Sequence, residues 1–307
     1  MDKALVDLIV QEVSRRIGPA ATPRSPVPEI WDAEEDCQRW RFSVLSNSGN
    51  DCLSDITAYD IKEKTFVRDP ADPEYLRQLK KSTPARIGLG RAGPRYLTIP
   101  WLRFRADHAQ AMDAVFSDVP AAFAEELGLV CAQTECSSKE EYLQRPDLGR
   151  RLSGQARAVL EGRCEHGMQV QVVVADGLSS SAILGNARDF LSSLRQGLSH
   201  EGLREGTPVF VRYGRVAVMN DIGEVLRPEV VVEIIGERPG LVTARSMSSY
   251  MCYRPGAKTV ESDMSMVANI HSGGFPPVEA GAHVASMVKQ IITARASGIK
   301  LTTGGAG

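Results

Sequence analysis

The chain lacks a long hydrophobic run. No apolar stretch among its 307 residues approaches the roughly 18 residues that a membrane-spanning helix needs. It also lacks an excess of one charge, because 36 Lys and Arg stand against 38 Asp and Glu. A net charge of −2 gives no global attraction to nucleic acid or to a membrane surface. We therefore expect no nucleic-acid partner and no membrane partner.

Clustered metal ligands are missing as well. The five histidines, at 108, 166, 200, 271 and 283, lie far apart, and Cys131 and Cys136 have no second pair of cysteines to complete a zinc-type motif. The six cysteines are scattered, and acidic residues at positions 2, 7 and 12 do not fit a signal peptide. We expect reduced thiols, a cytoplasmic location and no structural metal.

The N-terminal part is predicted to be a helix on a tether. Apolar side chains recur at helical spacing over residues 2–17, and Gly18 and Pro19 end the pattern. We assign residues 1–18 as an amphipathic helix, which packs either on the body of the protein or on a partner. Residues 19–70 form a second segment, which begins with a Pro-rich tether at 19–36 and is otherwise unassigned.

Residues 71–165 are predicted to form a helical domain, with helices over 74–81, 98–116 and 121–127 and a fourth capped by Asp147. Within it, positions 77–105 carry eight basic residues and no acid, with aromatic side chains between them. This basic stretch is a solvated face, a contact for an acidic partner or phosphate, or, less simply, an RNA-binding surface.

Residues 166–302 are predicted to form a Rossmann-like, mostly parallel α/β sheet domain. The runs at 170–175 and 230–235 are apolar almost throughout, which is typical of strands covered on both faces. Helical patterns over 182–198 and 278–297 alternate with them, and residues 249–253 suggest a further strand. The intervening residues 254–277 are expected to be a loop.

The stretch 206–240 organises this domain and supplies the first candidate site. We place strand ends at Val216 and at Glu237, which lies between Gly236 and Gly240. Ligands of open α/β sheets bind beyond the carboxyl ends of the strands. A carboxylate at such an end either pairs with Arg238 or another base, or hydrogen-bonds a ligand.

Three further motifs give weaker evidence for a ligand-binding site. Residues 88–93 fit G-x-G-x-x-G, but Pro84 precedes and Pro94 follows where a strand and a helix should stand. Residues 177–181 fall short of G-x-S-x-G, so helix capping is the simpler interpretation, with a phosphate cradle as the alternative. His271 lies on a Gly-rich loop and is either a ligand contact or part of the loop's structure.

Eight short motifs taken together carry a family resemblance. In chain order they are GRAGPR at 90–95, LRF at 102–104 with ADH at 106–108, RPDLGRRL at 145–152, ADGLS at 175–179, FVRYGRV at 210–216, GERPGL at 236–241, NIH at 269–271 and PPVEA at 276–280. Each is short, but their order is specific. From residue 74 to residue 302 the chain resembles the small (light) subunit of ethanolamine ammonia-lyase.

The resemblance implies an adenosylcobalamin-dependent lyase that converts ethanolamine to acetaldehyde and ammonia. Substrate and radical chemistry would belong to a barrel-shaped large subunit, and both chains would assemble into a heterododecamer. The positions that match the family's cobalamin contacts are Val216, Glu237 and Met266, the last standing where relatives carry Cys. No catalytic residue is expected in this chain, which would be inactive alone, since the cofactor supplies the difficult chemistry.

The family's setting also suggests a role for residues 1–18. A short helix followed by a Pro-rich tether resembles peptides that dock enzymes inside bacterial microcompartments, so a shell contact is expected there. Two other functions stay open on the sequence alone: a stand-alone Rossmann-like nucleotide-binding oxidoreductase, and an RNA-binding module that uses the basic stretch.

Overall fold

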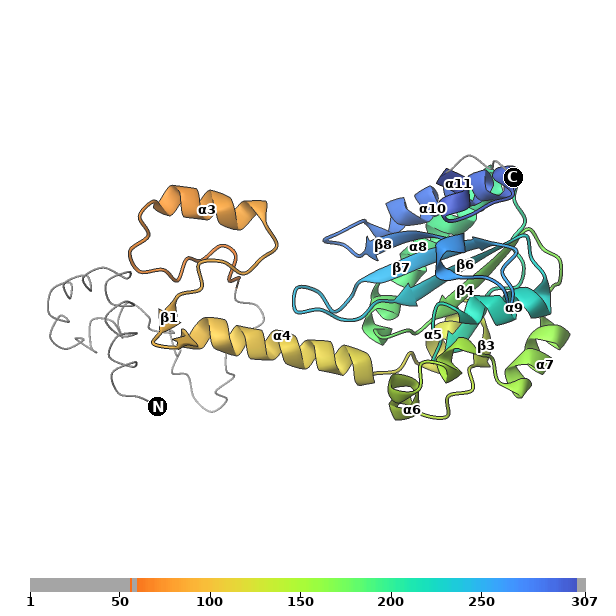
Figure 1. Cartoon of the computed structure of the whole chain (residues 1–307), viewed down its shortest axis with the longest axis horizontal. Coiled ribbons are helices and arrows are strands. Elements are labelled where there is room, and N and C mark those ends of the chain that lie inside the picture. The colour runs from red at the N-terminus through yellow and green to blue at the C-terminus, as the bar shows by residue number, and fades with distance from the viewer. Residues whose placement is uncertain (1–55, 57–59, 303–307) are drawn as a thin grey trace, which may run out of the picture. The chain divides into compact units, whose positions relative to one another are not determined.

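The computed structural model describes residue 56 and residues 60–302 (Figure 1). The predicted docking helix at 1–18, the tether at 19–36 and most of the unassigned segment up to residue 70 lie outside this range. Within the described residues, no helix combines the length and the hydrophobicity needed to cross a bilayer.

The main body is a six-stranded mixed sheet with the strand order β3-β5-β4-β6-β7-β8. The first four strands in this order run parallel, whereas β7 and β8 are antiparallel to their neighbours. The bounds are β3 Val130–Gln133, β4 Val170–Ala175, β5 Val209–Arg212, β6 Val230–Gly236, β7 Met247–Tyr253 and β8 Met264–Ile270. The prediction of a mostly parallel α/β sheet is confirmed for these residues.

Helices cover both faces of the parallel half of the sheet (Figure 1). On one face lie α8 (Ser180–His200) and α10 (Pro277–Ala294), which pack on each other and on the strands. On the other lie α7 (Gly154–Arg163) and α9 (Val218–Leu226). The alternation of strand side chains explains the two cores, because Val172 and Val174 face α8 and α10 while Val173 faces α7 and α9.

Smaller elements precede and connect these. They are α3 (Pro73–Ser82), the paired strands β1 (Arg91–Ala92) and β2 (Arg95–Tyr96), α4 (Thr98–Phe116), α5 (Ala121–Glu126), α6 (Lys139–Gln144), the 3₁₀ turns η2 (Leu148–Arg150) and η3 (Glu261–Asp263), and α11 (Ile299–Thr302). The G-x-G-x-x-G segment is thus the approach to a β-hairpin. A Cβ on Gly90 would lie 2.3 Å from the Phe66 carbonyl, so glycine is required there by packing and not by a nucleotide.

Several boundaries differ from the prediction. The sheet edge β3 lies inside the segment expected to be helical, and β8 lies in the segment expected to be a loop. Asp147 was predicted to cap α7, but its side chain caps nothing there; Ser153 does, accepting a hydrogen bond from the amide of Ala156. The division of the chain at residues 165 and 166 stays a prediction, although β3 and α7 contribute to the same sheet and core as the residues after it.

Candidate functional site

The sheet has a topological switch point between β4 and β6. From β4 the chain passes through α8 to β5 on one side, and from β5 through α9 to β6 on the other side of β4. In open α/β sheets the crevice beyond such a point is the usual place for a nucleotide or another ligand. The loops that follow β4 and β6 therefore decide which ligand could enter.

Here that crevice is filled by backbone. The amide of Leu178 donates a hydrogen bond of 3.0 Å to the carbonyl of Gly236. A Cβ on Gly177 would lie 2.3 Å from the same carbonyl oxygen, and one on Gly236 would lie 2.2 Å from the carbonyl of Ser179. The two loops touch so closely that no phosphate group fits between them.

The first turn of α8 is closed as well. Ser179 accepts a hydrogen bond from the amide of Ala182, and the hydroxyls of Ser179 and Ser181 both donate to the carbonyl of Ala244, at 2.6 and 3.1 Å. Helix capping therefore accounts for this serine run. A phosphate cradle at residues 177–181 finds no support, which also weakens the interpretation as a nucleotide-binding oxidoreductase.

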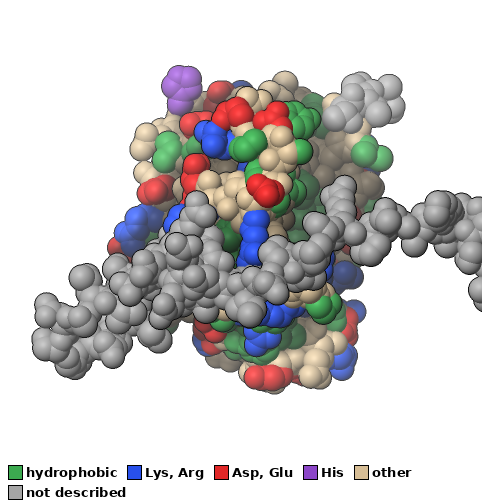
Figure 2. Space-filling view, turned by 90° about the vertical axis from the view of Figure 1, so that its left-hand side faces the viewer, with side chains coloured by type: hydrophobic (Ala, Val, Ile, Leu, Met, Phe, Trp, Pro, Cys, Tyr) green, Lys and Arg blue, Asp and Glu red, His purple; other side chains and the backbone are tan. Residues whose placement is uncertain are grey.

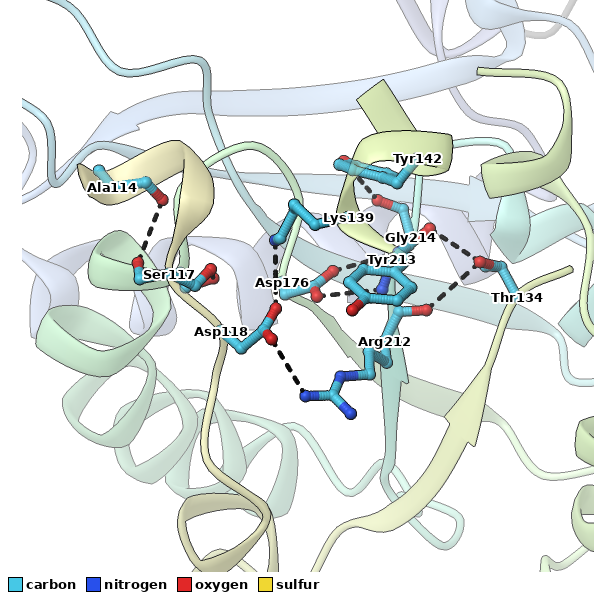
Figure 3. Close-up of polar contacts among 11 residues, drawn as sticks. Ala114, Ser117, Asp118, Thr134, Lys139, Tyr142, Asp176, Arg212, Tyr213 and Gly214 are labelled. Atoms are coloured by element: carbon cyan, nitrogen blue, oxygen red, sulfur yellow. Dashed lines mark hydrogen bonds and ion pairs between the residues drawn. The ribbon is translucent and has the colours of Figure 1, made fainter. Parts of the chain in front are cut away.

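Next to the switch point, the loop after β5 is held rigidly (Figure 3). The Asp176 carboxylate accepts hydrogen bonds from the amides of Tyr213, at 3.0 Å, and Gly214, at 3.2 Å. The carbonyl of Tyr213 accepts from the Thr134 hydroxyl and that of Gly214 from the Tyr142 hydroxyl. Tyr213 has φ of +58°, an uncommon conformation for a non-glycine residue, which these bonds maintain.

The same loop continues to Val216. The amide of Arg215 donates to the carbonyl of Gly149 at 2.8 Å, and its guanidinium lies 4.2 Å from the centre of the Tyr142 ring. Val216 follows, half-buried, just before α9. The prediction that a strand ends at Val216 was wrong: β5 ends at Arg212. The fixed loop nonetheless presents Val216 in one position.

Three charged side chains lie around Asp176, the buried Lys139 and the more exposed Asp118 and Arg212 (Figure 3). Burial raises the pKa of Asp176 to about 6, against the lowering effects of Lys139 and of the loop amides. The Lys139 ammonium lies 5.6 Å from the centre of the Tyr142 ring and 5.3 Å from that of Tyr213, and it pairs with Asp118 at 3.5 Å. Asp176, which follows β4, thus binds the loop after β5, and Lys139, at the start of α6, lies beside the same loop.

Glu237 follows β6 and is half-buried. Its Oε1 accepts hydrogen bonds from the Ser248 hydroxyl at 2.6 Å and from the Asn269 amide at 2.9 Å. These are neutral donors from β7 and β8, not the ion pair with Arg238 considered from the sequence. Both of these hydrogen bonds are made to Oε1.

Met266 lies on the same face of the sheet. It pairs with Tyr250 in β7, which in turn pairs with Glu233 in β6, and residues directly opposite across strands point to the same side. Met266 is 51% exposed. This face is accessible at the edge strand β8, where Met266 and Ala268 are exposed, whereas Ser248 and Cys252 on the same face of β7 are buried.

The structure thus brings the three candidate residues to one side of the sheet. Val216 and Tyr250 pack at the margin of the core cluster beneath α7 and α9, and burial followed by the charges of Glu237 and Glu233 raises the pKa of Tyr250. Tyr250 was not identified from the sequence. No local signal marks it, because its place beside Met266 depends on strand register.

Glu233 is the second residue that the sequence did not single out. Its side chain is fully buried in β6, and both carboxylate oxygens lack a hydrogen-bond partner among the described residues. Burial raises its pKa well above the ordinary value. A single Glu within an otherwise apolar strand was the available signal.

His271 belongs to the structure of its loop. Its Nε2 lies 2.9 Å from the side-chain oxygen of Asn269, and its Nδ1 accepts a hydrogen bond from the amide of Gly273 at 3.1 Å. Both ring nitrogens are engaged, so the interpretation as a ligand contact loses its support. The described residues contain no group of three or more His, Cys, Asp or Glu side chains placed to hold a metal ion.

The basic stretch divides into internal and exposed residues. Lys80 is buried and donates to the carbonyls of Ile61 and Ile87, while Arg86 and Arg103 both pair with the buried Asp107. The other five are exposed: Arg77, Lys81, Arg91, Arg95 and Arg105. Lys and Arg side chains gather in the middle of the face seen in Figure 2. With three of eight used internally, the case for RNA binding is weaker.

The helix α4 exposes apolar side chains beside these charges. Trp101, Leu102, Met112 and Phe116 are between 43% and 51% exposed, and the buried residues of this 19-residue helix are Pro100, Asp107 and Ala114. Exposed aromatic and aliphatic side chains flanked by arginine are typical of protein–protein contacts. This surface suits a protein partner better than a polyanion.

The chain is therefore an α/β protein of the doubly wound type. The crevice at its switch point, where related folds bind nucleotides, is closed, and an accessible part of the sheet face lies beside it. The family model described as ethanolamine ammonia-lyase light chain (EutC) matches residues 73–302. The chain belongs to this family.

Named relatives agree with the family match. An ethanolamine ammonia-lyase small subunit from Clostridium perfringens is 47% identical over 249 residues, which is 81% of this chain and 84% of the relative. One from Lachnoclostridium phytofermentans is 46% identical over 252 residues, 82% and 85% of the two chains. One from Clostridioides difficile is 45% identical over 252 residues, 82% and 86%.

Proposed function

We propose that this chain is the cofactor-holding small subunit of an adenosylcobalamin-dependent ethanolamine ammonia-lyase, which acts with a large subunit to convert ethanolamine to acetaldehyde and ammonia. Family membership supports the lyase assignment. The observation that carries the cofactor assignment is the accessible sheet face where Glu237 and Met266 lie beside Tyr250.

The residues of this face fit a corrin. A corrin ring offers a broad apolar surface with amide groups at its edge, so its protein contacts need apolar side chains and hydrogen-bond acceptors. Val216 and Met266 supply the former, and the carboxylate of Glu237 supplies the latter. Methionine at position 266 offers a soft, polarizable sulfur, but it excludes a role that needs a thiol.

The remaining contribution of the chain is to hold its side of the site fixed. The hydrogen bonds that Asp176 accepts and that Thr134 and Tyr142 donate fix the loop before Val216, and Ser248 fixes Glu237. When bound, the cofactor supplies the radical chemistry that no side chain can provide. We therefore infer that this chain orients the cofactor and excludes water while having no activity alone.

The large subunit is the proposed partner of the exposed surface around α4. Arg91 and Arg95 are the first residues of the two hairpin strands that precede it, and Trp101 and Phe116 are exposed on the helix itself. An apolar contact with a positive rim fits a large, complementary partner. We propose assembly of the two chains as a heterododecamer.

One assay tests the proposal as a whole. Ethanolamine deamination with adenosylcobalamin is compared for this chain, the large subunit and their mixture. We expect activity in the mixture alone. An assembled mixture that binds adenosylcobalamin without deaminating ethanolamine would contradict the lyase assignment, and one that does not bind it would contradict the cofactor assignment.

We further propose that residues 1–18 direct the enzyme into a bacterial microcompartment, on the strength of the helix and tether pattern in the sequence. Deletion of residues 1–18 is expected to leave deamination unchanged and to abolish encapsulation. Enclosure of the truncated enzyme at the level of the full-length enzyme would overturn this proposal.

A further inference from the structure

A cavity lies at the end of the sheet opposite Glu237. It has a volume of about 460 Å³ and lies between the end of β7, the loop at 254–259, the end of α10 and the start of α11. Tyr253 at its wall pairs with Val230, the first residue of β6, whereas Glu237 follows the last. The strand length separates the two sites by roughly 20 Å.

Positive charge is concentrated in this cavity. Four of its lining residues are basic, Arg254, Lys258, Arg295 and Lys300, and the one acidic lining residue is Asp263. Asp263 is already paired with Lys300 at 2.9 Å. The carboxylate of Glu224, on α9, accepts from the amide of Ala257 on the loop at 3.0 Å. The cavity is thus locally positive in a chain whose net charge is −2.

Two of these arginines adopt a conformation that favours glycine. Arg254 has φ of +42° and Arg295 has φ of +53°. Arg295 ends α10, and its amide bonds the carbonyl of Ile291, the position where helices most often use glycine. A non-glycine residue is strained there. Glycine could therefore replace either arginine without backbone strain, which allows the side chains to be removed cleanly in a test.

The floor of the cavity is rigid. The Ser297 hydroxyl accepts the amide of Tyr253 at 2.9 Å and donates to the carbonyl of Asp263. The amide of Gly298 donates to Ser265 at 2.9 Å, and a Cβ there would lie 2.0 Å from the carbonyl of Ser262. The backbone that carries Arg295 and Lys300 is therefore fixed before any ligand arrives.

We infer that this cavity is an anion site that takes a phosphate group, either free or carried by a small molecule. Arginine guanidinium groups match phosphate oxygens in pairs, and Arg254, Lys258 and Arg295 supply three cations around one space of ligand size. The site is independent of the cobalamin site, since its residues and its end of the sheet are different.

The test measures binding of inorganic phosphate and of AMP to the full-length chain, alone and with the large subunit, by calorimetry at low ionic strength. Saturable binding is expected for the unaltered chain. The double variant Arg254→Gly with Arg295→Gly should weaken it by about tenfold or more. Its melting temperature should be equal or higher, because glycine adopts a positive φ without strain.

Arg227→Gly is the matched control. Arg227 is also an exposed arginine with positive φ, at +52°, and it ends α9, but it does not line the cavity. The Arg227→Gly variant should also have an equal or higher melting temperature, and it should bind phosphate like the unaltered chain. Tighter binding of AMP than of phosphate would identify a nucleotide as the source of the group, and equal binding would identify phosphate itself. The inference is overturned if neither probe saturates the unaltered chain, or if the double variant binds as well as Arg227→Gly.

Discussion

Glu237 accepts a hydrogen bond of 2.6 Å from the hydroxyl of Ser248, a residue of the neighbouring antiparallel strand. This bond uses one carboxylate oxygen and fixes the orientation of the other. The Glu237 side chain at the end of β6 is thereby held by the sheet itself. In the proposed site, its second carboxylate oxygen accepts a hydrogen bond from the ligand.

Replacing Glu237 by alanine is therefore expected to weaken binding of adenosylcobalamin by the two-chain complex. Loss of one charged acceptor should raise Kd by about tenfold. Titration followed by the absorbance of the cofactor measures this without relying on activity. Ser248→Ala should have a smaller effect in the same direction, because the acceptor remains but is less fixed.

Glu165→Ala provides a control for that titration, since Glu165 is an exposed acid remote from the accessible sheet face. It should bind the cofactor like the unaltered complex. An unchanged Kd in Glu237→Ala would remove this residue from the site.

Asp176 predicts a pH dependence of stability. Its pKa is raised to about 6 in the folded chain, above the value of about 3.9 in an unfolded chain. The folded state therefore holds the proton more tightly. This contribution, on the order of 2 to 3 kcal/mol, is full below about pH 4 and is lost as the pH rises through 6.

Asp176→Asn resembles the protonated acid and cannot titrate. Its NH2 group cannot accept from one of the two loop amides, which costs a constant amount of stability. Between pH 4.5 and pH 8, however, the difference in free energy of unfolding should shift toward the variant by about 2 kcal/mol, because only the unaltered chain loses stability as Asp176 ionises. Urea unfolding at a series of pH values gives both curves. A difference between the two proteins that stays constant from pH 4.5 to 8 would show that Asp176 does not titrate in this range.

The closed crevice makes a prediction about glycine. Gly236→Ala would bring a Cβ to 2.2 Å from the Ser179 carbonyl, a backbone atom that cannot move freely. We expect a loss of about 2 to 4 kcal/mol in the free energy of unfolding. Thermal or urea unfolding measures it.

Gly162→Ala is its counterpart. Gly162 lies inside α7, and an added Cβ would meet nothing within 4 Å. Because alanine favours a helix more than glycine does, this variant should be more stable by about 0.5 to 1 kcal/mol. If both variants lost stability equally, close contact at Gly236 would not be the cause.

The exposed arginines near α4 should matter for assembly and not for folding. Changing Arg91 and Arg95 together to glutamate is expected to reduce co-purification with the large subunit, most strongly at low salt, because added salt screens the repulsion that the glutamates introduce. The melting temperature of the chain alone should change little, because both side chains are exposed.

A charge-matched control replaces Arg150 and Arg204, which are also exposed, by glutamate. It carries the same change in net charge and should co-purify normally. Equal recovery of the two double variants with the large subunit would exclude this surface from the interface.

The sequence predicted correctly those elements whose residue pattern depends only on neighbouring positions in the chain. The runs at 170–175 and 230–235 became β4 and β6 almost to the residue, and α4 has the predicted bounds. Strands buried on both faces must be apolar throughout, so they are conspicuous in the sequence. The order of the eight short motifs likewise indicated the family, and the match over residues 73–302 confirms it.

Elements whose stability comes from their neighbours were missed. β3 and β8 are edge strands with mixed side chains, and their pairing is supplied by β5 and β7. The same holds for the basic stretch, in which Arg86 and Arg103 share Asp107. A count of charged residues between 77 and 105 cannot reveal their acidic partner, because Asp107 lies just beyond that stretch.

The family, the central strands and three residues to examine could be predicted from the order of the amino acids. That the switch-point crevice is closed, and that Glu237 and Met266 share one face of the sheet with Tyr250, became evident from the folded chain. These features depend on strand register. A shift of one residue turns every side chain of a strand to the other face of the sheet, and register is set by contacts between segments far apart in the chain.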